Sequence, residues 1–164
     1  MNASCSQKNL ARGLSVVSRA VTRSTRTLPV LGNVLVSAKD SRLKLSATDL
    51  EIGITCWIEA KVEEEGATTV PARAFRDLVK SLPGDRVEMA LTVRTQTLNV
   101  RCGSFNNDIE CIDAQEFPLM PEADPSSGVQ LNVEDLREMI GQVAFAAATD
   151  DTRPSMTGVL AKID

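Results

Sequence analysis

The sequence predicts an α+β fold, in which two helices pack on one face of an antiparallel sheet and an incomplete second copy of this unit follows. Three observations lead to this prediction. Apolar and polar residues alternate along several short stretches, as in antiparallel strands with one buried face. Two other stretches place apolar residues three and four positions apart, as amphipathic helices do. The end of the chain repeats the apolar spacing of its beginning.

The first helix is expected over residues 8–23 and has two opposite faces. At about 100° per residue, an apolar stripe lies at about 180–240° from Lys8 and consists of Leu10, Leu14, Val17 and Val21. The basic residues lie within about 60° of Lys8 and are Arg12, Arg19 and Arg23. Arg26 extends this basic row if the helix reaches it, although Pro29 favours an earlier end.

Charge is divided unevenly along the chain. No Asp or Glu precedes Asp40, and the Lys and Arg residues before it give residues 1–39 a charge of +6. The whole chain carries −4, so residues 40–164 carry −10. A basic element on an acidic body attracts a polyanion locally while the rest of the protein repels it. The position of the basic residues on the helical wheel, taken alone, is explained more simply by a solvated face on a core-packed helix.

Three strands are expected next, over residues 28–36, 41–47 and 50–58, with a hairpin turn at Asp40–Ser41. Residues 63–66 predict an exposed turn. The second helix is expected over residues 71–82, because Pro71 suits a first helical turn and Pro83–Gly84 ends a helix. It has a basic side of its own, made of Arg73, Arg76 and Lys80. Strands over residues 87–93, 98–102 and 105–112 complete the sheet.

A repeat divides the chain into domains. The apolar spacing of residues 136–143 matches that of 10–17, at an offset of 126, and residues 152–160 match 27–35 at an offset of 125. We therefore expect a first domain over residues 1–113, a linker rich in Pro and Ser over 114–127, and the beginning of a second domain over 128–164. Because 37 residues cannot enclose a core, the sequence is expected to be a fragment of a longer chain.

Composition argues against several classes of protein. There is no His for general acid–base catalysis, no nucleophile elbow and no glycine-rich phosphate loop, so no enzyme activity and no cofactor are expected. The four Cys residues are widely spaced, which predicts reduced thiols in a cytoplasmic protein and no metal site. Aromatic residues make up 3% of the chain, which disfavours binding of single strands by base stacking.

Five stretches resemble the bacterial DNA polymerase III beta subunit family, the replicative sliding clamps. They are TLPVLGNVL at 27–35, LSATDLE at 45–51, TTVPAR at 68–73, EFP at 116–118 and TRPxxTGVL at 152–160. The resemblance implies a DNA-clamp fold with three similar domains per subunit and a head-to-tail homodimer. The six domains then form a closed ring around duplex DNA, with helices lining the hole and sheets outside. It implies a non-catalytic processivity factor that binds the DNA polymerase III alpha subunit, the clamp loader and repair proteins through short peptides.

The resemblance also implies sites. The basic helix faces are expected to meet DNA phosphates without reading sequence, through Arg23, Arg26, Arg73 and Lys80 first, and through Arg12 and Arg19 behind them. The second-copy helix departs from this pattern, since it carries Glu134, Asp135 and Glu138. Arg153 and Met156 match positions that line the partner-peptide pocket, and Ala74, Leu78 and Ile109 match the dimer interface.

A second hypothesis stays open at this point. The first helix could instead belong to a non-catalytic interaction module that binds an anionic membrane surface or an acidic partner. Against it, the helix lacks interfacial aromatic residues, and its apolar stripe is needed by the sheet. No apolar run of the sequence approaches the length that spans a membrane. Binding to liposomes that requires anionic lipid would favour this hypothesis over the clamp.

Overall fold

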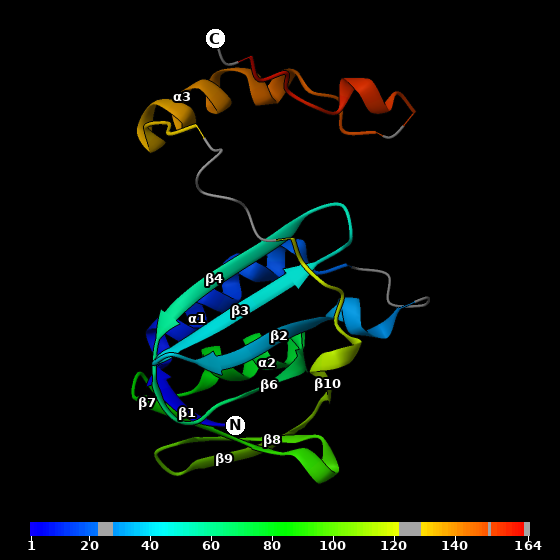
Figure 1. Cartoon of the computed structure of the whole chain (residues 1–164). Coiled ribbons are helices and arrows are strands. Elements are labelled where there is room, and N and C mark those ends of the chain that lie inside the picture. Colours follow the sequence, from blue (N-terminus) through cyan, green and yellow to red (C-terminus); the bar gives the residue numbers. More distant parts are fainter. Residues whose placement is uncertain (23–27, 122–128, 151, 163–164) are drawn as a thin grey trace. The chain divides into compact units, whose positions relative to one another are not determined.

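The computed structural model describes residues 1–22, 28–121, 129–150 and 152–162 (Figure 1). The chain divides into two compact units, Met1–Pro121 and Glu122–Asp164, and each is described by itself. The first unit ends later than the predicted domain end at residue 113. Phe117 is buried in it at 6% exposure. The strand β10 (Ile112–Asp113) also pairs with β6 (Gly66–Pro71). Residues 114–121, expected in the linker, therefore belong to the first unit.

The first unit contains two antiparallel five-stranded sheets, where the sequence predicted one. The first sheet has the order β5-β1-β7-β8-β9, and the second has the order β10-β6-β2-β3-β4. The strands of the first sheet are β5 (Lys61–Glu64), β1 (Asn2–Ser6), β7 (Arg86–Thr92), β8 (Thr97–Cys102) and β9 (Phe105–Glu110). The second sheet contains β10 and β6, given above, together with β2 (Asn33–Lys39), β3 (Arg42–Thr48) and β4 (Gly53–Glu59).

The division into two sheets follows from three strands that the sequence did not predict, β1, β5 and β6. β1 has a short polar sequence, NASCS, yet it buries the small residues Ala3 and Cys5. β5 contains Glu63 and Glu64, two of the three consecutive acids that predicted an exposed turn, and it pairs with β1. Because β1 pairs with β7 on its other side, these strands form a separate sheet from β2, β3 and β4. The α+β class and the antiparallel pairing are confirmed.

The first helix, α1 (Gln7–Val17), is shorter than predicted. A short 3-10 helix, η1 (Ser18–Ala20), follows it, and Val21 already has extended backbone angles. The Ser18 hydroxyl donates a hydrogen bond of 2.5 Å to the Leu14 carbonyl oxygen in the last turn. The Ser18 backbone N–H also donates to this carbonyl, and a hydroxyl bonded back in this way slightly destabilises and bends a helix. The predicted helix end at residue 23 was therefore wrong, and Arg19 lies on the 3-10 turn.

The second helix, α2 (Ala72–Ser81), follows the prediction closely and runs antiparallel to α1. The Gln7 side chain, at the start of α1, donates a hydrogen bond of 2.7 Å to the carbonyl oxygen of Val79, near the end of α2. Ser18, at the end of α1, lines one pocket together with Ala72, at the start of α2. Figure 1 shows α1 behind β3 and β4, and α2 behind β2 and β6. The two helices lie side by side, as predicted.

The core lies between these helices and the sheets. From α1, Leu10, Leu14 and Val17 are fully buried, and α2 contributes Phe75 and Val79. The buried residues of the sheets include Val34, Val36, Leu43, Leu45, Val70, Val87, Met89, Leu98 and Val100. Gly13 allows the close approach of α1 to the sheet, because a Cβ at this position would lie 2.8 Å from Leu45 Cδ1. The basic side of α1 is consequently the side turned away from the core.

Two of the predicted strands begin later than the alternation indicated. Residues 29–32 form a 3-10 helix, η2 (Pro29–Gly32), before β2. Asp49 Oδ1 accepts hydrogen bonds from the backbone N–H groups of Glu51 and Ile52, which makes a turn before β4 and leaves Leu50 exposed. The hairpin at Asp40–Ser41 is confirmed, with positive φ values of 49° and 57°.

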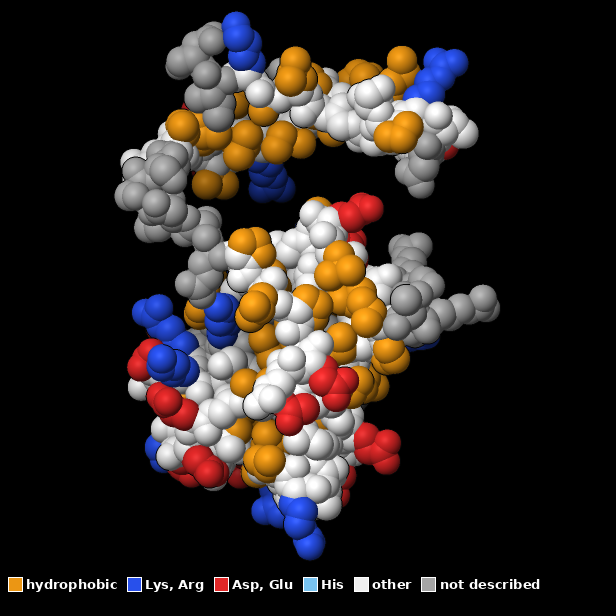
Figure 2. Space-filling model, turned by 45° about the vertical axis from the view of Figure 1, so that its right-hand side comes forward, with side chains coloured by type: hydrophobic (Ala, Val, Ile, Leu, Met, Phe, Trp, Pro, Cys, Tyr) orange, Lys and Arg blue, Asp and Glu red, His pale blue; other side chains and the backbone are white. Residues whose placement is uncertain are grey.

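The second unit repeats the beginning of the first in its secondary structure. Its helix α3 (Val133–Val143) and the 3-10 helix η5 (Ala144–Ala146) lie 126 positions after α1 and η1 and have the same lengths. A further 3-10 helix, η6 (Pro154–Met156), begins 125 positions after η2, and both start at a Pro. The apolar stripe of α3 is exposed, and it consists of Leu136, Met139, Ile140 and Val143. Figure 2 shows hydrophobic side chains gathered along this unit.

Candidate nucleic-acid interface

Most cations of the first unit that lie on helices follow the antiparallel pair α1–α2, while Arg94 lies on the 3-10 helix η3 (Val93–Thr95). Arg12 is exposed on α1 and Arg19 on η1, while Arg73 and Lys80 are exposed near the two ends of α2. Because α1 and α2 are antiparallel, Arg73 lies near the end of α1 and Lys80 near its start. The row therefore extends along the whole helix pair. Arg23 and Arg26, also predicted to contact DNA, lie outside the described residues.

A pocket of about 540 Å³ opens where α1 ends beside the start of α2. The residues that line it are Ser18, Val21, Thr22, Gly32, Ala72, Arg73 and Arg76. Arg73 and Arg76 supply guanidinium groups, which suit phosphate oxygens because they donate two parallel hydrogen bonds. Ser18 and Thr22 complete the polar part of the lining, although the Ser18 hydroxyl already donates to the Leu14 carbonyl oxygen. The chemistry of this lining suits an anion with several oxygen acceptors.

The start of α2 adds to the positive potential of this pocket. Its N-cap residue, Pro71, has no side-chain acceptor, and its first turn contains no acid. The first backbone N–H groups of a helix have no partner within the helix and carry partial positive charge. Arg76 was predicted on the basic side of α2 but was not among the predicted DNA contacts. Its place in the pocket depends on how α1 and α2 pack, which the spacing within α2 does not reveal.

One acid stands among these cations. Asp77 pairs with Arg76 at 3.1 Å, measured from Nη2 to Oδ1, and with Arg73 at 3.9 Å, measured from Nε to Oδ2. The Arg73 side chain is 92% exposed, and that of Asp77 is 55% exposed. Exposed ion pairs contribute roughly 0–1 kcal/mol to stability, so the guanidinium groups can exchange Asp77 for another anion at little cost.

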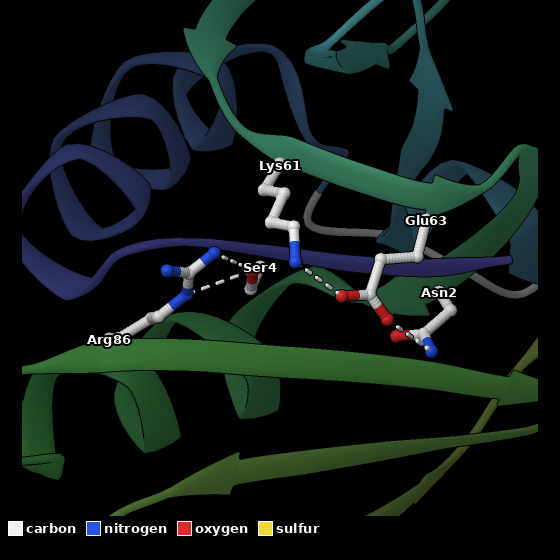
Figure 3. A network of polar contacts seen from close by, with 5 residues as sticks. All are labelled: Asn2, Ser4, Lys61, Glu63 and Arg86. Atoms are coloured by element: carbon white, nitrogen blue, oxygen red, sulfur yellow. Dashed lines mark hydrogen bonds and ion pairs between the residues drawn. The ribbon is translucent and has the colours of Figure 1, made fainter.

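The cations of the first sheet are held differently (Figure 3). Arg86 donates hydrogen bonds of 2.9 and 2.6 Å, from Nε and Nη2, to the hydroxyl oxygen of Ser4. Lys61 Nζ lies 2.8 Å from Glu63 Oε1, and Asn2 Nδ2 donates to the other carboxylate oxygen of Glu63 at 3.2 Å. The hydrogen bond and charge of Lys61 hold the pKa of Glu63 below its ordinary value. These cations are engaged within the strands.

Other surfaces of the first unit carry charges of both signs. Figure 2 shows Lys and Arg side chains mixed with Asp and Glu side chains over one face, with hydrophobic side chains between them. The outer strand β9 carries Asp108 and Glu110, both exposed. The helix pair is predominantly basic instead: α1 and α2 together contain one acid, Asp77, and five cations, which are Lys8, Arg12, Arg73, Arg76 and Lys80.

The remaining predicted site residues lie on separate elements. Ala74 and Leu78 occupy the side of α2 opposite Arg76, at about 200–240° from Ala72 on the helical wheel. Ile109 is in β9, and it packs against the core as Leu78 does. Arg153 precedes η6, and Met156 ends it with 54% exposure. The assignment of these residues to interfaces stays a prediction.

The described residues give no indication of catalytic chemistry. No group of three or more Cys, Asp or Glu residues among them could hold a metal ion. The four cysteines are free thiols. Burial raises the pKa of Cys5 to about 12, although the Arg86 charge opposes the rise. No helix in the described part of the chain is long and apolar enough to cross a membrane.

Comparisons with known proteins give consistent matches. Residues 1–121 match the family described as DNA polymerase III beta subunit, N-terminal domain. The beta sliding clamp of Synechocystis sp. is 37% identical, over 94% of this chain and 41% of that protein. The beta sliding clamp of Staphylococcus epidermidis is 34% identical, over 81% of this chain and 37% of that protein. The chain thus spans about two fifths of the length of these relatives.

Solved structures give the same result. The DNA polymerase III subunit beta from Pseudomonas aeruginosa superposes with a TM-score of 0.84 and 31% identity, over 96% of this chain and 42% of that chain. A putative DNA polymerase III beta subunit from Eubacterium rectale superposes with a TM-score of 0.88 and 30% identity, over 96% of this chain and 43% of that chain. The match therefore extends beyond the first unit.

Proposed function

Because the chain belongs to the DNA polymerase III beta subunit family, we propose that it acts within a sliding clamp and that its α1–α2 pair faces duplex DNA. The observation that carries this proposal is the row of exposed cations along the two antiparallel helices, with the pocket lined by Arg73 and Arg76 where they meet. The contacting residues are Arg12, Arg19, Arg73, Arg76 and Lys80. Arg23 and Arg26 are proposed to continue the row on sequence grounds.

Phosphate contact suits a protein that must slide. Phosphates repeat along the duplex without sequence information, whereas contacts to base edges would fix the protein at one register. The exposed guanidinium groups of Arg73 and Arg12 can reach phosphates as the duplex moves past. Retention then depends on enclosure of the DNA rather than on tight binding by any one side chain.

We propose that enclosure comes from a ring of two chains of this family, arranged head to tail with three domains each. Ala74, Leu78 and Ile109 are the proposed dimer-interface residues of this chain. Arg153 and Met156 are proposed to contribute to a pocket for short peptides of the DNA polymerase III alpha subunit, the clamp loader and other clamp-binding proteins. In this role the chain is a cytoplasmic, non-catalytic processivity factor, and the polymerase supplies the chemistry.

The alternative of a helix that lies on an anionic membrane is not supported. Such a helix inserts its apolar face among lipids. The apolar stripe of α1 is instead buried in the core of the first unit, with Leu10, Leu14 and Val17 at 0% exposure. Exposing this stripe to a bilayer would remove α1 from the sheet.

The test measures duplex binding by the 164-residue chain. Fluorescence anisotropy is recorded across a salt series with two duplexes of unrelated sequence. We expect weak binding, with a Kd of roughly 10⁻⁴ M at physiological salt and tighter at low salt, and with equal affinity for both duplexes. Arg73→Glu with Lys80→Glu should remove most low-salt binding, because two phosphate contacts become repulsive. Each lost contact should reduce the salt slope by about 0.9.

A matched control makes the same charge change elsewhere. Lys61→Glu with Arg101→Glu also replaces two cations by two acids, but on the sheet. This control should weaken binding only slightly, through the net charge. Equal losses in the two double variants would contradict the assignment of the DNA face to the helices, and a strong preference for one duplex would contradict sequence-blind contact.

A further inference from the structure

The helices α1 and α3 occupy equivalent positions of the internal repeat but carry opposite charge. Both have 11 residues, and α3 begins 126 positions after α1. Their apolar stripes coincide in this register, with Leu136 at the position of Leu10 and Ile140 at that of Leu14. The same register places Glu134 where α1 has Lys8, and Glu138 where it has Arg12.

The difference in charge is large for such short elements. α1 contains Lys8 and Arg12 and no acid, which gives it a charge of +2. α3 contains Arg137 together with Glu134, Asp135 and Glu138, which gives it a charge of −2. Glu134 and Glu138 are exposed on α3, as Lys8 and Arg12 are on α1. The face that is basic in the first unit is therefore acidic in the second.

Of the two helices, α3 follows the ordinary electrostatic preferences of helix ends and α1 does not. Acids near a helix start interact favourably with its partial positive charge, and an Asn N-cap satisfies free N–H groups. In α3, Asn132 Oδ1 accepts hydrogen bonds from the N–H groups of Glu134 at 2.8 Å and Asp135 at 3.4 Å. In α1, the side chain of the N-cap residue Ser6 makes no capping hydrogen bond, and the first turn contains no acid.

α2 departs from these preferences in the same direction as α1. Its N-cap Pro71 makes no side-chain hydrogen bond, and its first turn contains Arg73 and no acid. Departures from local rules are expected where a surface is kept for function. Both helices of the first unit thus keep positive charge at some loss of local stabilisation, whereas α3 shows no such constraint.

We infer that phosphate contact in this chain is confined to the α1–α2 pair, and that Glu134 and Glu138 keep the duplex away from α3. This inference rests on the proposed function, because it concerns the same anionic ligand. A carboxylate at a helix position where the other copy has a cation reverses the sign of the interaction with a phosphate. The two copies of the repeat then contribute unequally to DNA contact, one attracting and the other repelling.

The experiment compares two equivalent positions in the 164-residue chain. Ser15 and Gly141 are 126 positions apart, and each lies on the charged face of its helix, at about 340° from Lys8 and from Glu134 respectively. Both are exposed, and a Cβ at Gly141 would meet no heavy atom within 4 Å. A photo-crosslinking residue is placed at one position or the other, and the yield of covalent adduct with a 30-base-pair duplex is measured at low salt.

We expect the yield at position 15 to exceed that at position 141 by roughly tenfold, because charges of opposite sign surround the two positions. Glu134→Gln with Glu138→Gln should raise the yield at position 141 several-fold. Asp108→Asn with Glu110→Asn removes the same charge from β9 and should leave that yield nearly unchanged. Glu138→Gln alone, outside the first turn of α3, should give part of the increase while far-UV circular dichroism verifies that α3 stays helical.

The outcomes separate the two proposals. Equal salt-dependent yields at positions 15 and 141 would overturn the confinement of contact to the first unit while leaving DNA binding intact. A yield at position 141 that responds equally to the Glu134/Glu138 and Asp108/Glu110 variants would overturn the role of the α3 acids. Absence of salt-dependent adduct at both positions, together with no binding in anisotropy, would overturn the proposed function itself.

Discussion

Leu14→Ala tests how α1 is held in the first unit. Leu14 is fully buried against the sheets, at the centre of the apolar stripe of α1. Truncation removes three carbon atoms from a closed core, and such Leu→Ala changes cost about 2–5 kcal/mol, the larger values applying where the cavity cannot collapse. Helix propensity offsets little of this, since Leu and Ala both favour helices. We expect a loss near the middle of that range, a large fraction of the 5–15 kcal/mol that typically stabilises a domain.

The assay is urea unfolding followed by tryptophan fluorescence. Trp57 is the single Trp of the chain and lies on β4, so its fluorescence reports on the first unit. Two controls carry the argument. Val16→Ala changes a residue of the same helix that is 38% exposed, and it should cost under about 1 kcal/mol. Ile140→Ala changes the position equivalent to Leu14 in the second unit and should leave the Trp57 midpoint unchanged. Similar losses for Leu14→Ala and Val16→Ala would refute the packing described for α1.

Three further predictions concern single groups. Lys61→Ala should raise the pKa of Glu63, measured by carboxylate carbon NMR, because it removes the hydrogen bond and the charge that lower this pKa; an unchanged pKa would contradict the pairing. The stabilisation that Glu63 contributes is present above its ordinary pKa and is lost as the pH falls through the lowered value. Cys5 is buried and has a pKa of about 12, so it should resist iodoacetamide in the folded chain at pH 8, whereas the half-buried Cys56 should react. Equal labelling of the two thiols in mass spectrometry would contradict the burial of Cys5. Asn132→Ala should weaken α3 by about 1 kcal/mol through loss of its cap, seen as lower far-UV ellipticity at 222 nm, while Ser6→Ala at the uncapped start of α1 should change ellipticity much less.

The parts of the fold that the sequence predicted are those with strong periodicity or distinctive turn residues. α2 has an apolar stripe bounded by Pro71 and by Pro83–Gly84, and its predicted limits fall within one residue of the observed ones. The hairpin at Asp40–Ser41 was recognisable because Asp and Ser are common turn residues. β1 gave no comparable signal, since it is short and buries Ala3 and Cys5 rather than large apolar residues. Its assignment depends on pairing with strands more than 50 residues away, which no local pattern contains.

The candidate site was predictable to a similar degree. The helical wheel identified Arg12 and the basic side of α2 from spacing alone. It misplaced Arg19, because α1 ends at Val17, six residues before the predicted end at residue 23, and Arg19 lies on the 3-10 helix η1. Arg76 could be placed on the basic side but not in the pocket, because that pocket arises only when α1 and α2 lie antiparallel. Spacing within one element therefore predicts a face, while contacts between elements require the tertiary structure.

The way in which the helical cations are held bears directly on the proposed sliding along DNA. Arg86 is fixed by two hydrogen bonds to Ser4, so moving its guanidinium group to a phosphate would first break both. Arg73 has only a 3.9 Å pairing with Asp77 and is 92% exposed, so an exchange of its partner involves little desolvation and a weak competing bond. A barrier to translation along DNA grows with the strength of the contacts that must be broken at each step. On the proposed function, weakly held and exposed cations along α1 and α2 keep the free-energy barrier to each step low. The same weakness means that such a surface cannot retain DNA without enclosure.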